Sequence, residues 1–343
     1  MTIKAPNTTN QNESCTMKGL TVPLIHRRAV LALGALAASG LARSQESEGV
    51  LRLVVPFAAG STIDALARLI ANKLPEVSAH KVVVVDNRPG AAGILGTSYV
   101  AKARPDGKTL LIQANGLTTT PAVRSDLPYD LQKHLAPLTL LGLAPYGIVV
   151  PGDARFQTLG ELFSAARASG QPITFGTSGP GSQSEFVLAQ VAKAAKVDFL
   201  KVPFKGQADI LLAVMGGHVQ MAMINMPSAV KQAADRKVKI LATMTERRTP
   251  ATPEVPTLTE AGIAGISESA WYGLLTTAGT PAPALEGLSK DLLTVLGLPD
   301  VRARLADLGI DVVASSPSQF GDRLATELRR YQVIAKEENI KAD

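Results

Sequence analysis

Short apolar runs alternate with segments of helical periodicity along most of the chain. Residues 50–57 form a nearly continuous apolar run, as expected for a strand that is buried on both faces of a parallel sheet, and residues 81–86 predict a second strand. Between them, apolar residues recur every three or four positions from Ile63 to Leu74, which is the spacing of an amphipathic helix. Alternating strands and helices predict an α/β fold built from βαβ units.

The alternation restarts near Tyr146, where a new strand begins. A proline-rich stretch at 247–262 interrupts it, and a strand resumes at Trp271. Two α/β lobes are the simplest interpretation, and the last helices are expected to return to the first lobe because that lobe is otherwise short. The expected domains are a discontinuous first lobe, residues 46–145 plus 272–343, and a second lobe, residues 146–271.

The N-terminal region has the features of a secretory signal peptide. Two arginines at 27–28 precede an apolar run at 29–42, in which Gly40 and Ala42 have the −3 and −1 spacing of a cleavage site. The run is too short to span a bilayer. We therefore expect residues 1–44, the signal peptide with its upstream leader, to be removed on export to the periplasm.

Several points about the leader stay open on the sequence alone. Translation begins at either Met1 or Met17. The paired arginines are compatible with a twin-arginine route as well as with the general secretory route. The competing interpretation of the apolar run is a buried hydrophobic helix of the folded protein.

Cleavage changes what the charge implies. The whole chain has a net charge of +6, and removal of four basic residues and one acidic residue within 1–42 lowers it to +3. The mature protein then has no basic run, which argues against nucleic-acid binding. Its only cysteine, Cys15, lies within the removed segment, so disulfides and thiolate metal sites are excluded.

Catalytic motifs are missing from the sequence. The mature chain has no G-x-S-x-G, P-loop or Rossmann motif, and His80, His134 and His218 do not have metal-ligand spacing. Acidic residues are scattered as on solvated helix surfaces. We expect no catalytic residue, no metal and no cofactor, although a nucleophile–base pair assembled across the fold stays the alternative.

Two loops of small residues, 56–62 and 177–184, each follow a predicted strand and precede a helix. Ligands of open α/β sheets bind at this edge. A helix N-terminus presents unpaired N–H groups and the positive end of the helix dipole. Small side chains let an anion approach these groups without any lysine or arginine. The competing explanation is that the glycines only serve tight turns.

The stretch VPFAAGSTIDALAR at 55–68 is similar to the pattern V-P-F-x-x-G-G-x-x-D-x-x-A-R. The similarity extends over about residues 50–340, and further blocks follow in order: VVVDNRPGAAGILG, ARPDGKTLL, LPYDLQKHLAPLTLL, FGTSGPGSQSEF, VPFKGQADILLAVMGGHVQMAMIN and PEVPTLTEAGIAG. Together they resemble the Bug family, the TctC-like substrate-binding proteins of tripartite tricarboxylate transporters. The resemblance implies a two-lobed periplasmic binding protein of type II, each lobe a mostly parallel sheet flanked by helices, with the ligand cleft between the lobes.

The resemblance also implies a function and a site. It implies a monomeric receptor that binds a small carboxylate, such as a dicarboxylate, tricarboxylate, acidic amino acid or aromatic acid, and delivers it to membrane transporter subunits. Presentation to a sensor kinase and, less favoured, an exported enzyme on the same fold are the alternatives. The implied ligand-binding residues are Phe57, Ala58, Ala59, Gly60, Ser61, Thr62, Asp64, Thr177, Ser178, Gly179, Gly181, Ser182, Gln183 and Asn225.

This chain departs from the family pattern at two positions. Ser61 stands where a second glycine is usual, and Glu185 stands where the pattern has a histidine. Glu185 either adds negative charge near the second loop or faces solvent. Asp64 either fixes the first loop as part of a capping box with Ser61 or contacts a ligand amine. Trp271 and the adjacent tyrosine either line the cleft or serve ordinary packing.

Overall fold

The computed structural model describes residues 50–249 and 252–341, so the expected signal peptide, residues 1–44, lies outside the described residues. The strands are β1 (Val50–Val55), β2 (Val82–Asn87), β3 (Thr109–Ala114), β4 (Leu135–Pro151), β5 (Ile173–Thr177), β6 (Phe199–Pro203), β7 (Met221–Asn225), β8 (Val238–Thr243), β9 (Ser269–Thr277) and β10 (Asp311–Val312). The helices are α2 (Thr62–Val77), the 3₁₀ helix η1 (Ala91–Gly93), α3 (Ile94–Ala101), α4 (Gly116–Val123), α5 (Leu131–His134), α6 (Leu159–Ser169), α7 (Gln183–Ala195), α8 (Gln207–Met215), α9 (Met226–Ala234), α10 (Ala282–Gly297), α11 (Pro299–Asp307) and α12 (Pro317–Glu337).

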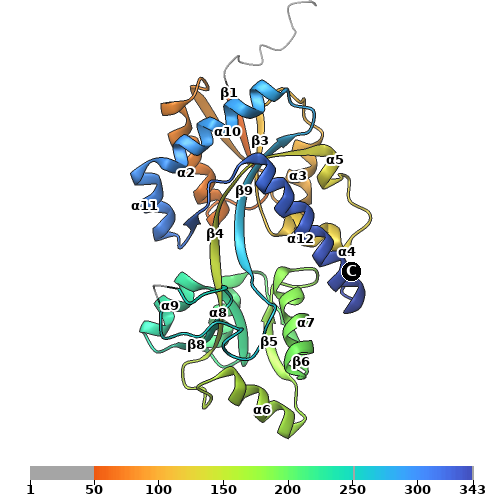
Figure 1. Cartoon of the computed structure of the whole chain (residues 1–343), viewed down its shortest axis with the longest axis vertical. Coiled ribbons are helices and arrows are strands. Elements are labelled where there is room, and N and C mark those ends of the chain that lie inside the picture. The colour runs from red at the N-terminus through yellow and green to blue at the C-terminus, as the bar shows by residue number, and fades with distance from the viewer. Residues whose placement is uncertain (1–49, 250–251, 342–343) are drawn as a thin grey trace, which may run out of the picture. The chain divides into compact units, whose positions relative to one another are not determined.

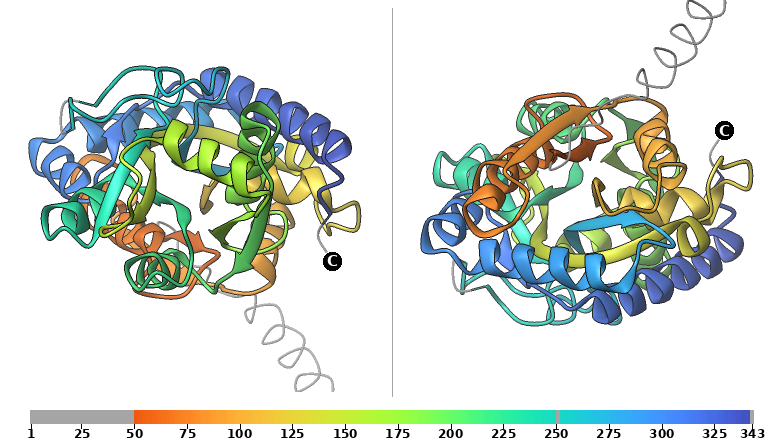
Figure 2. Two further views of the ribbon diagram at one scale, coloured as in Figure 1. Left: turned by 90° about the horizontal axis from the view of Figure 1, so that it is seen from below. Right: turned by 90° about the horizontal axis from the view of Figure 1, so that it is seen from above.

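The strands form one curled, mixed sheet in the order β2-β1-β3-β9-β4-β7-β5-β6, and β8 and β10 also pair with β4. The β1–β2, β1–β3, β5–β6 and β5–β7 pairs are parallel, as the βαβ pattern predicts. The strands that join them, β4 and β9, pair in antiparallel fashion. Figure 1 shows β4 and β9 side by side in the middle of the molecule, and Figure 2 shows the helices around the strands.

The long strand β4 differs from the sequence-based expectation of a strand that begins near Tyr146. It starts at Leu135, pairs with β9 through Pro145, and pairs with β7 from Tyr146 onward. Its register against β9 shifts between Pro137 and Thr139. A proline lacks the N–H that a regular ladder requires, so a shift in register lets the strand continue past it.

In the first half of the sheet (β2, β1, β3, β9 and the first part of β4), the inner strands are buried on both faces. The edge strand β2 is covered on one face only, and Val82 and Val84 on its other face are exposed. Along β1, Leu53 faces a core that it shares with helices α2, α10 and α11, whereas Val54 faces a core that it shares with α3 and α12. Along β3, Leu110 and Leu111 divide in the same way. This arrangement accounts for the continuous apolar runs, since every position of a doubly covered strand is buried.

The second half of the sheet (the end of β4 with β7, β8, β5 and β6) repeats the arrangement. Val150 and Phe175 lie in a core with α6 and α7, and Val149 and Ala222 lie in a core with α8 and α9. The fold is therefore the two-lobed α/β binding-protein architecture that the sequence blocks imply. Within residues 50–249 and 252–341, no helix combines the length and hydrophobicity that a membrane span needs.

The junction between β1 and α2 is held by one buried carboxylate. Ser61 is the N-cap of α2, as its spacing to Asp64 predicts, and its hydroxyl accepts the Asp64 N–H. The Asp64 carboxylate accepts the Gly60 N–H at 2.9 Å, the Asn87 amide at 2.8 Å and the Arg68 guanidinium at 3.0 Å. Burial alone raises the pKa of Asp64, but these three donors lower it overall.

We predict that Gly273→Ala destabilises the protein by about 1–3 kcal/mol, the usual cost of overpacking a filled core. A Cβ on Gly273, in β9, would lie 2.2 Å from the Phe320 ring, which itself packs edge-to-face on Trp271. Gly287, exposed on α10 with nothing within 4 Å of such a Cβ, is the matched control. Gly287→Ala should leave stability unchanged or raise it by up to about 1 kcal/mol, because alanine favours helix. Equal denaturant midpoints for Gly273→Ala and wild type would contradict the prediction.

We predict that Asp64→Asn lowers the free energy of unfolding by about 1.5–3 kcal/mol at pH 7, the range for hydrogen bonds to a charged group. Because the folded pKa of Asp64 lies below its ordinary value of 3.8, this advantage of wild type is complete above that value. It should disappear as the pH falls through the folded pKa. Asp126→Asn, which breaks an exposed pair with Arg124, is the control and should have little effect. Urea titrations at pH 7 and pH 3 measure both.

Candidate functional site

A cavity of about 580 Å³ is lined by residues from both halves of the sheet. Its walls come from strand ends and from the loops and helices that follow them. The lining residues are Phe57, Ala92, Ala114, Asn115, Gly116, Thr119, Thr120, Tyr146, Ser178, Pro180, Gly181, Ser182, Gln183, Ser184, Lys205, Gln207, Ile210, Met223, Ala270 and Tyr272.

Three helices begin at this cavity. Gly116 is the first residue of α4, Gln183 is the first residue of α7, and Gln207 is the first residue of α8. The first N–H groups of a helix have no acceptor within the helix, and the helix dipole makes this end positive. Three such ends around one cavity form an environment that favours an anion.

The lining of the cavity carries a positive charge and no negative one. Lys205 is the only lysine or arginine among these lining residues, and none of them is an aspartate or glutamate. Lys205 lies two residues before the first residue of α8, so its ammonium group adds to the positive end of that helix. Among residues 50–249 and 252–341, no group of acidic, histidine or cysteine side chains could hold a metal ion. The chemistry that this lining favours is binding of a negatively charged solute.

The second predicted loop lines the cavity, but it uses several of its own amides. The N–H groups of Ser178, Gly179 and Gly181 donate to the Ser184 hydroxyl, the Thr177 hydroxyl and the Glu185 carboxylate. Ser178, Gly181, Ser182 and Gln183 are lining residues, whereas Thr177 and Gly179 are not. The amides left for a ligand are therefore those of the first turn of α7, at residues 183 and 184.

Glu185 is buried, so the alternative in which it faces solvent is wrong. Its carboxylate accepts the Gly181 N–H at 3.2 Å, and the Lys201 ammonium lies 4.0 Å from its other oxygen. Like Asp64 in the first loop, it holds the loop in place from the first turn of the following helix. The Glu185 carboxylate is thus engaged by the loop and by Lys201.

The first predicted loop meets the cavity only through Phe57. Residues 58–62 are not part of the lining, and positions 58–60 and 62 are exposed. Asp64 is buried and engaged by its three donors, as described above. Asn225 is also outside the lining, but it lies opposite the lining residue Tyr146 in the β4–β7 ladder.

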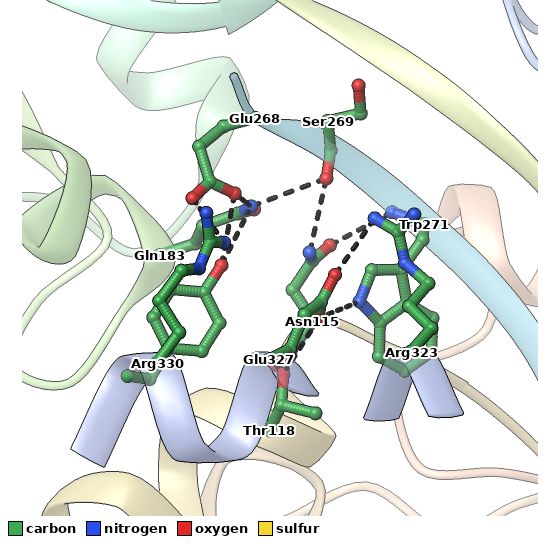
Figure 3. Close-up of polar contacts among 10 residues, drawn as sticks. Asn115, Thr118, Gln183, Glu268, Ser269, Trp271, Arg323, Glu327 and Arg330 are labelled. Carbon is green, nitrogen blue, oxygen red and sulfur yellow. Dashed lines mark hydrogen bonds and ion pairs between the residues drawn. The ribbon is translucent and has the colours of Figure 1, made fainter. Parts of the chain in front are cut away.

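A buried polar network stands behind the cavity (Figure 3). The Asn115 side-chain amide donates to the Ser269 carbonyl at 3.1 Å and accepts the main-chain N–H of Trp271 at 3.0 Å, which ties the start of α4 to β9. The Gln183 amide donates to Glu268 at 2.9 Å, which ties the start of α7 to the residue before β9. Two of the three helix ends are thereby fixed to one strand.

The C-terminal helix α12 supplies the other side of this network. Arg330 pairs with Glu268, and the Tyr331 hydroxyl donates to Glu268 at 3.1 Å. Glu327 accepts the Trp271 indole N–H at 2.8 Å and pairs with Arg323. Burial raises the pKa of the Glu268 carboxyl, although Arg330 acts in the opposite direction. Trp271 is fully buried and therefore belongs to the packing behind the cavity.

Sequence reasoning missed the α4 end of the site. Asn115 and Gly116 follow the apolar strand 109–114, and this is the same strand-to-helix signal that identified the two loops. The buried charges of Glu268 and Glu327 carry no local signal, because their spacing is that of ordinary surface positions. The sequence left open whether Trp271 and Tyr272 line the cleft, and of the two, Tyr272 lines the cavity.

Comparison with known proteins identifies the family. The model of the tripartite tricarboxylate transporter family receptor matches residues 66–340. A UPF0065 protein in the tcbD-tcbE intergenic region of Pseudomonas sp. (strain P51) is 34% identical over 325 residues, which cover 93% of this chain and 96% of that protein.

Solved structures of similar proteins include two from Rhodopseudomonas palustris. MatC with bound malate is 30% identical with a TM-score of 0.72, and the match covers 83% of this chain and 98% of that one. Rpa4515 with adipate is 29% identical with a TM-score of 0.74, and the match covers 85% and 97%. The resemblance seen in the sequence blocks is confirmed, and the protein is a solute receptor rather than an enzyme. The chain belongs to the tripartite tricarboxylate transporter family receptors, of the Bug or TctC type.

Proposed function

We propose that the protein is a periplasmic receptor that binds a small carboxylate in the cavity lined by α4, α7 and α8 and delivers it to a tripartite tricarboxylate-type membrane transporter. The observation that carries the proposal is the meeting of three helix N-termini at a cavity lined by one lysine and no carboxylate. The family to which the chain belongs supports the membrane transporter as the partner.

The carboxylate of the ligand is held mainly by main-chain N–H groups at Gly116, Gln183 and Ser184. Hydrogen bonds to a charged group contribute about 1.5–3 kcal/mol each. Two or three such bonds, less the cost of immobilising the ligand, are compatible with micromolar affinity near −8 kcal/mol. The hydroxyls of Ser178 and Ser182 lie in the same lining and supplement the amides.

Lys205 adds the one full positive charge, and it is exposed. An exposed ammonium group contributes little to the affinity of a bound anion, because water and salt screen the pair. It still attracts free anions over about 8–10 Å at moderate ionic strength. We therefore assign capture to Lys205 and retention to the buried helix ends. The solved relatives with malate and adipate support a carboxylate as the ligand class.

The lobe assignment made from the sequence stays part of this proposal: residues 46–145 plus 272–343 form one lobe and 146–271 the other. It is supported by the exchange of pairing partners along β4, from β9 at Pro145 to β7 at Tyr146. Ligand binding between two such lobes favours their closure.

The test is binding of carboxylic acids to the purified mature protein and to a variant with a charge placed in the site. A thermal-shift screen of mono-, di- and tricarboxylates, acidic amino acids and aromatic acids finds the ligand, since saturation at 100 times Kd stabilises a protein by about 2.7 kcal/mol. Gly116→Asp then sets a carboxylate at the first residue of α4, where a Cβ has nothing within 4 Å. Like charges in contact cost several kcal/mol, so calorimetry should show Kd for the hit raised about 100-fold or more.

Gly116→Asn is the matched control, because it adds the same volume without the charge. It should raise Kd by less than about tenfold, an energy near 1.4 kcal/mol. Aspartate in the first turn favours a helix, so both variants should fold. Stabilisation of wild type by neutral sugars or cations only, or normal acid binding by Gly116→Asp, would overturn the proposal.

Export is tested separately at the N-terminus. We expect removal of residues 1 to about 42–44, on the basis of the arginine pair, the apolar run and the Gly40-x-Ala42 site. N-terminal sequencing of the protein released from the periplasm should therefore begin near Arg43 or Gln45. An intact leader on the periplasmic protein would contradict this expectation.

A further inference from the structure

Two tyrosines line the cavity from the strands that join the two halves of the sheet. Tyr146 belongs to β4 at the point where that strand changes partners, and Tyr272 belongs to β9. Tyr146 packs against the main cores of both halves, and Tyr272 is part of the core of the first half. Their rings are thus fixed by packing in the wall of the cavity.

Their hydroxyl groups have no hydrogen-bond partner in the part of the chain that the structure describes, residues 50–249 and 252–341. Neither hydroxyl oxygen is fully buried, and both residues line the cavity. The buried hydroxyl of Tyr331, by contrast, donates to Glu268 at 3.1 Å. A largely buried tyrosine hydroxyl ordinarily has a hydrogen-bond partner, and only the cavity is left to supply one here.

Both hydroxyls stay protonated at physiological pH. Burial raises the pKa of Tyr272 to about 12, and burial, Tyr272 and Glu268 raise the pKa of Tyr146 well above its ordinary value. The cavity lining therefore offers two neutral donors, and no lining lysine or arginine other than Lys205 is present to balance a second carboxylate.

We propose that Tyr146 and Tyr272 bind a neutral oxygen of the ligand, a hydroxyl or carbonyl group, and so select oxygen-bearing acids over their unsubstituted counterparts. This inference rests on the proposed function, because it assumes that the carboxylate is held at the helix ends. It adds a second point of recognition, on the strands between the lobes. An acid that lacks the oxygen leaves both hydroxyls without a fixed partner, which is how a hydrogen-bonding site rejects an analogue.

The experiment compares acids that differ by one oxygen: benzoate with 3- and 4-hydroxybenzoate, succinate with malate, and butyrate with 3-hydroxybutyrate. Calorimetry on wild type, Tyr146→Phe, Tyr272→Phe and the double variant gives the ratio of Kd values within each pair. For the pair that binds, we expect wild type to prefer the oxygen-bearing acid about tenfold or more, the effect of one net hydrogen bond. The double variant should retain less than about a threefold preference, while its Kd for the unsubstituted acid stays within threefold of wild type.

Phenylalanine keeps the ring packing, so the variants should fold, and their unliganded melting temperatures check this. Tyr99→Phe is the control and should keep the wild-type ratio, because Tyr99 lies outside the lining and stacks under Arg88. An unchanged ratio in the double variant, or no preference in wild type, would overturn this inference and leave the carboxylate receptor intact. Failure of every acid to bind wild type would overturn both, and the helix-end variant Gly116→Asp distinguishes the two sites.

Discussion

The antiparallel pairing of β4 with β9 is the constraint on which the rest of the structure depends. These two strands lie in the middle of the sheet, and every other strand reaches the far half through one of them. Each half has its own pair of hydrophobic cores, and a smaller cluster joins Phe186 of α7 to Tyr331 of α12. The strands β4 and β9 run from one half into the other. The cavity lies against these strands because both contribute lining residues. Any motion that opens or closes it must therefore bend or twist this one ladder.

Buried charges beside the β4–β9 pairing restrict any such motion. Glu268 and Glu327 are taken out of water, and each keeps a guanidinium partner from α12. Breaking a buried pair by separating its members costs about 3–5 kcal/mol, more than most single contacts contribute. The ends of α4 and α7 are bonded to the same segment, so they move with it or lose these bonds. The network thus limits the orientations that the helix ends can take toward a ligand.

The sequence predicted the regular parts of the fold and only part of the site. Apolar runs identified β1 and β5, and the spacing of Ser61 to Asp64 identified the start of α2, because these signals are local. The long strand β4 was recognised only from Tyr146, since Pro137 and Gly142 interrupt its first part and its continuity depends on pairing with β9. In the site, the second loop was recognised from its glycines. Phe57 was the only residue of the first loop that the structure places in the lining. Tyr272 was left open between the cleft and ordinary packing, and neither the α4 end nor Tyr146 was assigned. Their juxtaposition depends on the packing of residues more than 100 positions apart, which no local pattern records.

The use of helix ends has a consequence for how such receptors diversify. A main-chain N–H is supplied by nineteen of the twenty amino acids, and only proline removes it. Under the proposed function, side chains at the start of α4, α7 and α8 can therefore change without loss of the main-chain groups that bind the anion, and an alanine scan of the cavity would leave those groups undetected. Selection on single side chains acts instead on the strand-borne residues and on the lysine at the rim. A duplicated gene on this scaffold can acquire a new ligand through a few substitutions there while it keeps its hold on the acid group, and relatives that share about a third of their residues still share the fold.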